Sequence, residues 1–247
     1  MLRAFTADLH VHTLLSPCAS VEMTPHHLVL QAEAMGVDIL AITDHNSCDN
    51  VKAALLAASG KPVTILPGME VETKEEAHIL VLFDALAPLL AWEQIVASHR
   101  SGRRNDEEKL GAQFIVDQYD EFVAVKEEML LDALNLTVAE VAETVEKLGG
   151  ITIAAHVDRP MYSLLTQLGF IPEGLQLSAL EISRRFGANE ARKAFSNLQN
   201  WPLVTASDAH SLEDFCQGPR TTLYLEKVSI AEIKLALAGS CGRSALF

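Results

Sequence analysis

The sequence predicts an α/β protein in which strands and helices alternate about seven times along the chain. The first observation is a set of short apolar runs bounded by turn-forming residues, which is typical of strands buried on both faces. The second is that helical patterns fill the gaps between these runs. Together they predict either a barrel or an open doubly wound sheet. A chain of 247 residues, 49% of them hydrophobic, suits a single barrel domain.

Seven strands are expected, over residues 6–11, 37–43, 63–66, 78–83, 151–155, 179–182 and 203–206. Residues 84 to about 136 separate the fourth and fifth strands by far more than a usual connection. The middle of this segment, residues 100–128, is rich in charge. We expect a helical insertion over one end of the barrel, within a single domain of residues 1–247. It is either a solvated elaboration or a lid that selects substrates.

Capping residues mark where the helices begin. Thr24 followed by Pro25 starts the first helix, and Gly36 ends it. Capping boxes start two later helices, at Thr137-x-x-Glu140 and at Ser229-x-x-Glu232.

Composition limits the partners and the compartment. The net charge of −14 makes broad nonspecific binding to nucleic acid unfavourable. We therefore expect a small phosphorylated substrate and no stable nucleic-acid complex. No apolar run is long enough for a membrane span, and the N-terminus lacks a signal-peptide pattern, so we expect no membrane association and a cytoplasmic location. The four cysteines form no C-x-x-C pair and suit reduced thiols.

Residue types that bind metals accompany most of the predicted strands. His10 and His12 are two residues apart in one strand, so both side chains point to the same face and can reach one metal. Further clusters lie at Asp44-His45, Glu70, His78, His156-Val-Asp158 and Asp208-Ala-His210. Most of them follow a strand, at the end where barrel enzymes build their active sites. Imidazole and carboxylate ligands together suit Zn, Mn or Fe.

These pieces resemble the motifs of the PHP (polymerase and histidinol phosphatase) phosphoesterases. The matching pieces are Asp8-Leu-His-Val-His-Thr13, Ala-Ile-Thr-Asp-His45, Pro-Gly-Met-Glu70, His78-Ile-Leu-Val-Leu, Ala-Ala-His156 and Ser-Asp208-Ala-His210. The resemblance implies a distorted seven-stranded (β/α)7 barrel of TIM-like type, two or three divalent metal ions, and hydrolysis of phosphate esters. It also implies that the metal ligands are His10, His12, His45, Glu70, His78, His156, Asp208 and His210.

One position departs from the family. Many members carry an aspartate ligand shortly after the first motif, where this sequence has Pro17. Proline cannot bind a metal, so either one metal has fewer protein ligands, or Cys18 or a water takes the position. Occupancy of a third metal site is therefore left open.

Two carboxylates and three arginines are the candidate catalytic and substrate-binding residues. Glu70 can bridge metals because a carboxylate has two oxygens, and Asp208 could orient or deprotonate the attacking water. Arginine matches phosphate geometry, so Arg159, Arg184 and Arg185, which follow the fifth and sixth strands, are candidates to bind the substrate.

The sequence thus predicts a metal-dependent phosphoesterase that hydrolyses a phosphate mono- or diester of a small metabolite, a nucleotide or an oligonucleotide end. One alternative is an amidohydrolase-like C–N hydrolase, but that group usually has a metal-bridging lysine, and no lysine here ends a predicted strand. The other is a catalytically degenerate PHP scaffold. Retention of eight ligand positions argues against it.

Overall fold

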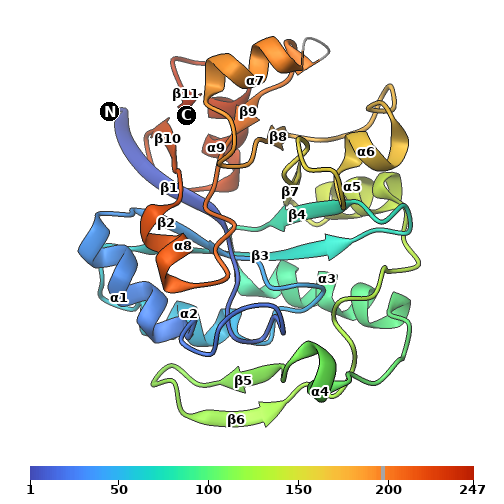
Figure 1. Cartoon of the computed structure of the whole chain (residues 1–247). Coiled ribbons are helices and arrows are strands. Elements are labelled where there is room, and N and C mark those ends of the chain that lie inside the picture. The colour runs from blue at the N-terminus through green and yellow to red at the C-terminus, as the bar shows by residue number, and fades with distance from the viewer. Residues whose placement is uncertain (196–197) are drawn as a thin grey trace.

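The computed structural model describes residues 1–195 and 198–247 (Figure 1). Within these residues the strands are β1 (Arg3–Val11), β2 (Ile39–Ile42), β3 (Thr64–Glu72), β4 (His78–Leu82), β5 (Phe114–Val116), β6 (Phe122–Val125), β7 (Ile151–Ala154), β8 (Ala179–Glu181), β9 (Leu203–Val204), β10 (Thr221–Leu225) and β11 (Ser244–Leu246). The helices are α1 (Pro25–Met35), α2 (Val51–Ala57), α3 (Leu86–His99), α4 (Glu107–Leu110), α5 (Val138–Lys147), α6 (Leu164–Leu168), α7 (Ala188–Ala194), α8 (Leu212–Gln217) and α9 (Ile230–Leu237).

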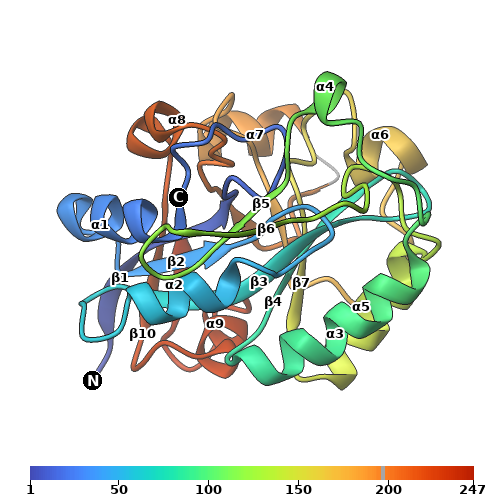
Figure 2. The ribbon, with the colours of Figure 1, turned by 90° about the horizontal axis from the view of Figure 1, so that it is seen from below.

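The main sheet has the strand order β11-β10-β1-β2-β3-β4-β7-β8-β9. Strands β1, β2 and β3 are parallel to one another, as are β7, β8 and β9. The chain after β9 returns to the end of β1, where Ala209 pairs with Val11 and its carbonyl accepts from the His12 amide at 3.1 Å. The sheet therefore curls into a nearly closed barrel, with helices packed outside it (Figure 1, Figure 2).

All seven strands expected from the sequence are present, as β1 to β4 and β7 to β9. One strand departs from the parallel arrangement of the barrel: β4 is antiparallel to both β3 and β7. Its first residue, His78, therefore lies at the end of the barrel where the parallel strands finish. Within the described residues β10 and β11 extend the sheet beyond the seven strands. Strand β10 alternates between buried and more exposed positions, a pattern unlike the continuous apolar runs.

Burial on both faces of the sheet explains the apolar runs. Along β4, Ile79 and Val81 belong to one hydrophobic cluster, and Leu80 and Leu82 belong to a second. The first cluster includes side chains from α1, α2, α3 and α5, and the second includes side chains from α9. Residues on both faces of the strand thus bury apolar surface. Each Å² removed from water stabilises the fold by about 25 cal/mol.

The helix ends follow the expected capping chemistry. Thr24 accepts from the His27 amide, and Gly36 ends α1 with a φ of 69°, a left-handed value that glycine adopts without strain. At the start of α5, Thr137 and Glu140 form both hydrogen bonds of the capping box. No helix in the described part of the chain combines the length and apolarity needed to cross a membrane.

The segment 84–136 is only partly helical. It contains α3 and the short α4, but its charged middle forms the β5–β6 hairpin, which the sequence did not predict. The hairpin lies beside the loops that follow β1 and β2 (Figure 1, Figure 2). The Phe114 amide donates to Leu14 O at 3.2 Å, and Asn50 Nδ2 donates to Phe114 O at 3.1 Å. These contacts place the hairpin at the end of the barrel where β1 and β2 finish.

Candidate metal centre

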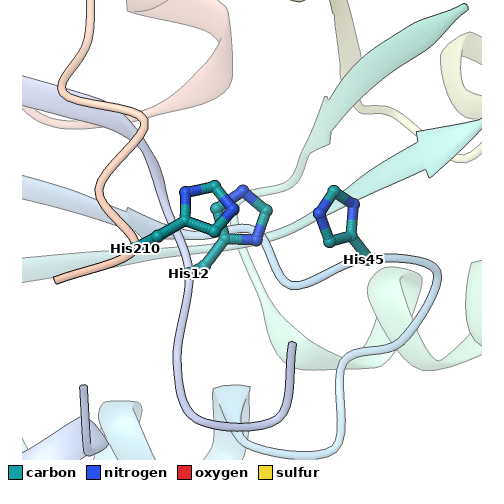
Figure 3. A group of neighbouring side chains, drawn as sticks. All are labelled: His12, His45 and His210. Atoms are coloured by element: carbon teal, nitrogen blue, oxygen red, sulfur yellow. The ribbon is translucent and has the colours of Figure 1, made fainter. Parts of the chain in front are cut away.

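The structure brings the eight predicted ligands together at one end of the barrel. They come from β1 and the segment after it, from the loop after β2, from β3, from the start of β4, and from the loops after β7 and β9; they are His10, His12, His45, Glu70, His78, His156, Asp208 and His210. Seven of them are buried, and His210 is partly exposed. Figure 3 shows three of the imidazoles, which reach the same place from three separate segments.

The β1 strand is irregular where it carries the first ligands. Its register against β2 shifts between Asp8 and Val11, a stretch that includes His10. Such a bulge changes the direction of side chains and often lies beside an active site. Two later ligands also have unusual backbone angles, with φ of 29° at His156 and 48° at Asp208. Left-handed backbone at residues other than glycine is strained and tends to occur at functional sites.

Glu70 lies at the centre of the cluster and is 1% exposed. Its two carboxylate oxygens contact five imidazole nitrogens: His10 Nε2 at 3.3 Å, His12 Nε2 at 3.3 Å, His45 Nδ1 at 3.1 Å, His78 Nδ1 at 2.9 Å and His156 Nε2 at 3.3 Å. A carboxylate surrounded in this way is placed to bridge more than one cation.

Asp208 is the second carboxylate of the cluster. Its Oδ1 lies 3.2 Å from His10 Nε2, 3.5 Å from His12 Nε2 and 3.7 Å from His210 Nδ1. Its other oxygen contacts the guanidinium of Arg159. Asp208 therefore contacts both the imidazoles of the first motif and the guanidinium of Arg159.

Hydrogen bonds fix which nitrogens of His10 and His12 carry protons. His10 Nδ1 donates to Glu181 at 3.0 Å, since a carboxylate only accepts. His12 Nδ1 donates to the Ser16 hydroxyl at 3.1 Å, because that hydroxyl gives its own proton to Asp44. The two Nε2 atoms lie 3.1 Å apart, and both face the carboxylates of Glu70 and Asp208. Two imidazole nitrogens at this distance, beside two carboxylates, fit a positive charge between them, either a shared proton or a metal cation.

The spacing of the ligand atoms also fits metal coordination. Metal–ligand bonds of about 2.0–2.2 Å place neighbouring ligand atoms roughly 3.0–3.5 Å apart, and the contacts of Glu70 and Asp208 with His10 and His12 fall at 3.2–3.5 Å. Three groups have ligand atoms within 4.8 Å of one another: His10 with His12 and Asp208, His45 with Glu70 and His78, and His12 with His45 and His210.

Pro17 and Cys18 follow the first ligand motif, and Cys18 lines a cavity together with His45 and His210 of the third group. Pro17 stands where many family members have a ligand. Cys18 lines the same cavity as the cluster but joins none of these ligand groups in the described part of the chain.

The electrostatics of the cluster favour bound positive charge. Burial opposes ionisation of Glu70, but His78 and His10 lower the pKa of this carboxyl well below its ordinary value. Burial likewise opposes ionisation of Asp208, and His10 chiefly lowers its pKa well below the ordinary value. Burial disfavours the charged form of His78, yet Glu70 and, to a smaller extent, Glu72 raise its pKa to about 9. The carboxylates therefore stay ionised and attract cations, either protonated imidazoles or metal ions.

Two acidic side chains support the ligands without facing the cavity. Asp44 supports a histidine through a hydroxyl: it accepts from Ser16 Oγ at 2.7 Å and from Thr13, and Ser16 in turn contacts His12. Glu181, the last residue of β8, was not predicted, although it is an acid inside an otherwise apolar run and is fully buried. An acidic residue inside an apolar strand was the sequence signal that could have identified it.

We expect Glu181→Gln to weaken divalent-metal affinity by about 10- to 100-fold, the usual effect of removing a partner that orients a histidine ligand. The amide can still accept from His10, but its lost charge makes the Nε2 atom a poorer donor to a metal. The measurement is a metal titration by calorimetry on chelator-treated protein. Glu173→Gln, an exposed change in the same connection between β7 and β8, is the matched control. Equal affinities in the two variants would contradict this role.

A cavity of about 250 Å³ adjoins the cluster and is lined also by Cys18, Leu131, Arg159 and Tyr162. A second cavity of about 350 Å³ shares His78, His156, Arg159 and Tyr162 with the first, and Arg185 lines it as well. Arg184 does not join them: its guanidinium pairs with Asp214 at 2.5 Å and lines a separate cavity. Of the three predicted arginines, the structure thus places Arg159 and Arg185 near the cluster.

The chain is similar to known proteins in both sequence and fold. The PHP domain family model matches residues 8–190. The chain is 40% identical over 73 residues to the 5'-3' exoribonuclease Rnm of Salmonella typhimurium, covering 29% of this chain and 24% of the relative. It is 35% identical over 112 residues to Rnm of Escherichia coli, covering 43% and 36%. The matches span only about a quarter to a third of the length of these curated relatives.

Two solved structures share the fold. The lesion-specific endonuclease PfuEndoQ from Pyrococcus furiosus has a TM-score of 0.75 and 21% identity, over 98% of this chain and 58% of that one. Endonuclease Q in complex with a 27-mer duplex bearing an abasic lesion has a TM-score of 0.72 and 21% identity, with the same coverage. These similarities confirm the predicted α/β barrel class.

The expectation of a small phosphorylated substrate without a nucleic-acid complex is wrong. The curated relatives are exoribonucleases, and a structure of the same fold holds a DNA duplex at its active site. The physical reason is that the net charge of −14 describes the whole surface. A nucleic-acid strand needs positive charge only where it binds, so the net charge of the whole chain does not exclude such a substrate.

Proposed function

We propose that this chain, which belongs to the PHP domain family, is a metal-dependent hydrolase of phosphoesters that removes nucleotides from the end of a nucleic-acid strand. The sequence-based prediction of a metal-dependent phosphoesterase agrees with this membership. The choice of a strand end rests on the exoribonuclease relatives and on the shape of the site.

The observation that carries the proposal is the buried ligand cluster that opens directly into an arginine-lined cavity. The two adjoining cavities, of about 250 and 350 Å³, together reach the size range of pockets for small molecules, about 300–1,000 Å³. A terminal nucleotide suits this space, whereas an unopened duplex would not enter it. The amidohydrolase-like alternative lacks comparable support, because the side chain at the centre of the cluster is the carboxylate of Glu70 and not a lysine.

The proposed ligands are the eight predicted residues, which would hold two or three divalent ions, with Zn, Mn or Fe as candidates. Such ions, when bound, would offset the negative charge of the phosphate and make a water more acidic. Glu70 would hold them together through its two oxygens. The third position depends on His45 and His210, because Pro17 supplies no ligand.

The remaining steps fall to side chains of this chain. Asp208, an ionised member of the cluster, would orient the attacking water and accept its proton. Arg159 contacts Asp208 and is about one-third exposed, so its remaining N–H groups can donate to a phosphate oxygen in the cavity. Arg185, in the outer cavity, would bind the next phosphate of the strand. Burial of the cluster excludes bulk water and strengthens these charge interactions.

The test is hydrolysis of a linear single-stranded oligoribonucleotide labelled at one end, compared with the same sequence as a closed circle. Protein stripped with chelator is assayed alone and after addition of Mn²⁺, Zn²⁺ or Fe²⁺. We expect metal-dependent shortening of the linear strand with release of mononucleotides, while the circle stays intact. A DNA strand of the same sequence measures sugar preference.

Three outcomes would count against the proposal. Cutting of the circle as fast as the linear strand would show that no end is needed. Release of inorganic phosphate in place of nucleotides would show a monoesterase. Absence of product with all three metals would show that the cluster does not perform this reaction.

A further inference from the structure

The loop after β7 forms an apolar shelf beside the ligand cluster. We define this shelf as Pro160, Met161 and Tyr162; it lines the cavity of about 350 Å³. Met161 is 62% exposed and Tyr162 is 40% exposed. Large apolar side chains left open beside a buried polar site commonly mark a binding surface.

Tyr162 is held in its place by strained backbone and by packing. Its φ is 57°, a left-handed value that is unusual for an aromatic residue. Its carbonyl accepts from the His78 amide at 2.9 Å. Its ring stacks on the His78 imidazole, with centroids 4.8 Å apart and planes inclined by 19°. The ring therefore has a fixed position between the two cavities, both of which it lines.

Guanidinium groups lie in the same cavity as this ring. Arg159 lines both cavities, and Arg185 lines the outer one. In the described part of the chain Arg185 has no carboxylate at ion-pairing distance, even though the protein is strongly acidic. An aromatic face next to cationic donors is the combination that binds a base and its phosphate in single-stranded nucleic acids.

We propose that the shelf is a nucleobase subsite: the base of the nucleotide next to the scissile phosphate stacks against Tyr162 and Met161, while Arg185 binds the adjoining phosphate. This proposal rests on the proposed function, because it assigns the substrate class of the same site. Stacking involves the face of a base, so the subsite accepts all four bases with little sequence preference.

The test compares two linear strands that differ only in whether the two terminal nucleotides carry bases or are abasic. For the wild type, kcat/KM is expected to be about 5- to 150-fold higher with bases, the range expected for one stacked base. Tyr162→Ala should remove most of this difference by slowing hydrolysis of the base-containing strand alone. Tyr162→Phe should keep it, since the ring remains. Phe122→Ala removes an exposed aromatic ring from β6, outside both cavities, and should change neither rate.

A binding measurement separates this proposal from the proposed function. Calorimetry with adenosine 5'-monophosphate and ribose 5-phosphate needs no turnover, and the wild type should bind the nucleotide more tightly by a similar factor. Tyr162→Ala should lose that difference and keep its metal content. If the wild type hydrolyses strands but binds both ligands with equal affinity and hydrolyses both strands at equal rates, the subsite alone is overturned. Tighter binding of the nucleotide than of ribose 5-phosphate, without hydrolysis of any strand, would support the subsite and overturn the exonuclease assignment.

One structural outcome would also overturn the subsite. Because Tyr162 packs on His78, its removal could disturb a proposed ligand. In that case Tyr162→Ala would lower metal content and slow both strands by the same factor. Tyr162 would then be a residue that positions His78, and the base would bind elsewhere.

Discussion

Asp208→Asn is expected to reduce hydrolysis of a nucleic-acid strand by at least about 1,000-fold, about 4 kcal/mol of barrier. The asparagine has nearly the same shape but cannot accept a proton and carries no charge. Its Oδ1 contacts to His10 and His12 would become weak amide contacts. Single-turnover rates, measured with saturating Mn²⁺, report the loss directly.

The matched control is Asp214→Asn, the same chemical change six residues further along, on α8. Asp214 pairs with Arg184 at a separate cavity, away from the two cavities beside the cluster, so its replacement should leave the rate within about twofold. Metal analysis then divides the role of Asp208. Retained metal with lost activity indicates that it handles the water and its proton, whereas loss of an ion indicates ligation. Turnover within about tenfold of the wild type, about 1.4 kcal/mol, would show that Asp208 has neither role.

The positions of the barrel strands could be predicted because burial on both faces leaves a continuous apolar run. The direction of a strand leaves no such trace. For β4 the only clue was His78, a ligand-type residue at the start of its strand while the others lie at strand ends. The antiparallel pairing of β4 with β3 resolves this, because it brings the amino end of β4 to the carboxyl ends of its neighbours.

Convergence of the ligands could be predicted from their places along the chain, but their supporting contacts could not. Glu181 and His10 are far apart in the sequence and meet only because β8 and β1 line one barrel. Likewise, nothing in the sequence distinguished Arg184 from Arg185 as binding residues. Neighbouring side chains generally point in different directions, and here Arg184 reaches Asp214 while Arg185 lines the outer cavity.

The segment 84–136 was the least predictable part of the fold. Its charge suggested a solvated helix, yet residues around Phe114 and Phe122 pair as strands β5 and β6. The hairpin is held by contacts to loops of the barrel, such as Asn50 Nδ2 with Phe114 O, which no local pattern encodes. Tertiary contacts of this kind override intrinsic propensity.

Glu70→Gln is expected to have the largest effect on metal content. The wild type should bind at least two divalent ions per chain, and the variant fewer than one, because Glu70 is the carboxylate shared by five imidazoles. Hydrolysis should fall by at least about 1,000-fold as a consequence. Elemental analysis after dialysis against Mn²⁺ or Zn²⁺ measures the first effect. The control is Glu72→Gln, which should retain two ions. Its carboxylate lies 3.9 Å from Nε2 of His78, the ring nitrogen that does not contact Glu70.

The same variant should change how the stability of the metal-free protein depends on pH. Glu70, with a smaller contribution from Glu72, raises the folded-state pKa of His78 from 6.5 to about 9 against the effect of burial. A raised histidine pKa contributes stability that is fully present below about pH 6.5 and is lost as the pH rises through about 9. The wild type should therefore exceed Glu70→Gln in unfolding free energy most at pH 6.5, and this advantage should shrink towards pH 9. Denaturant titrations in chelator at several pH values measure it. A difference that stayed constant or grew with pH would show that Glu70 and His78 are not coupled in the folded protein.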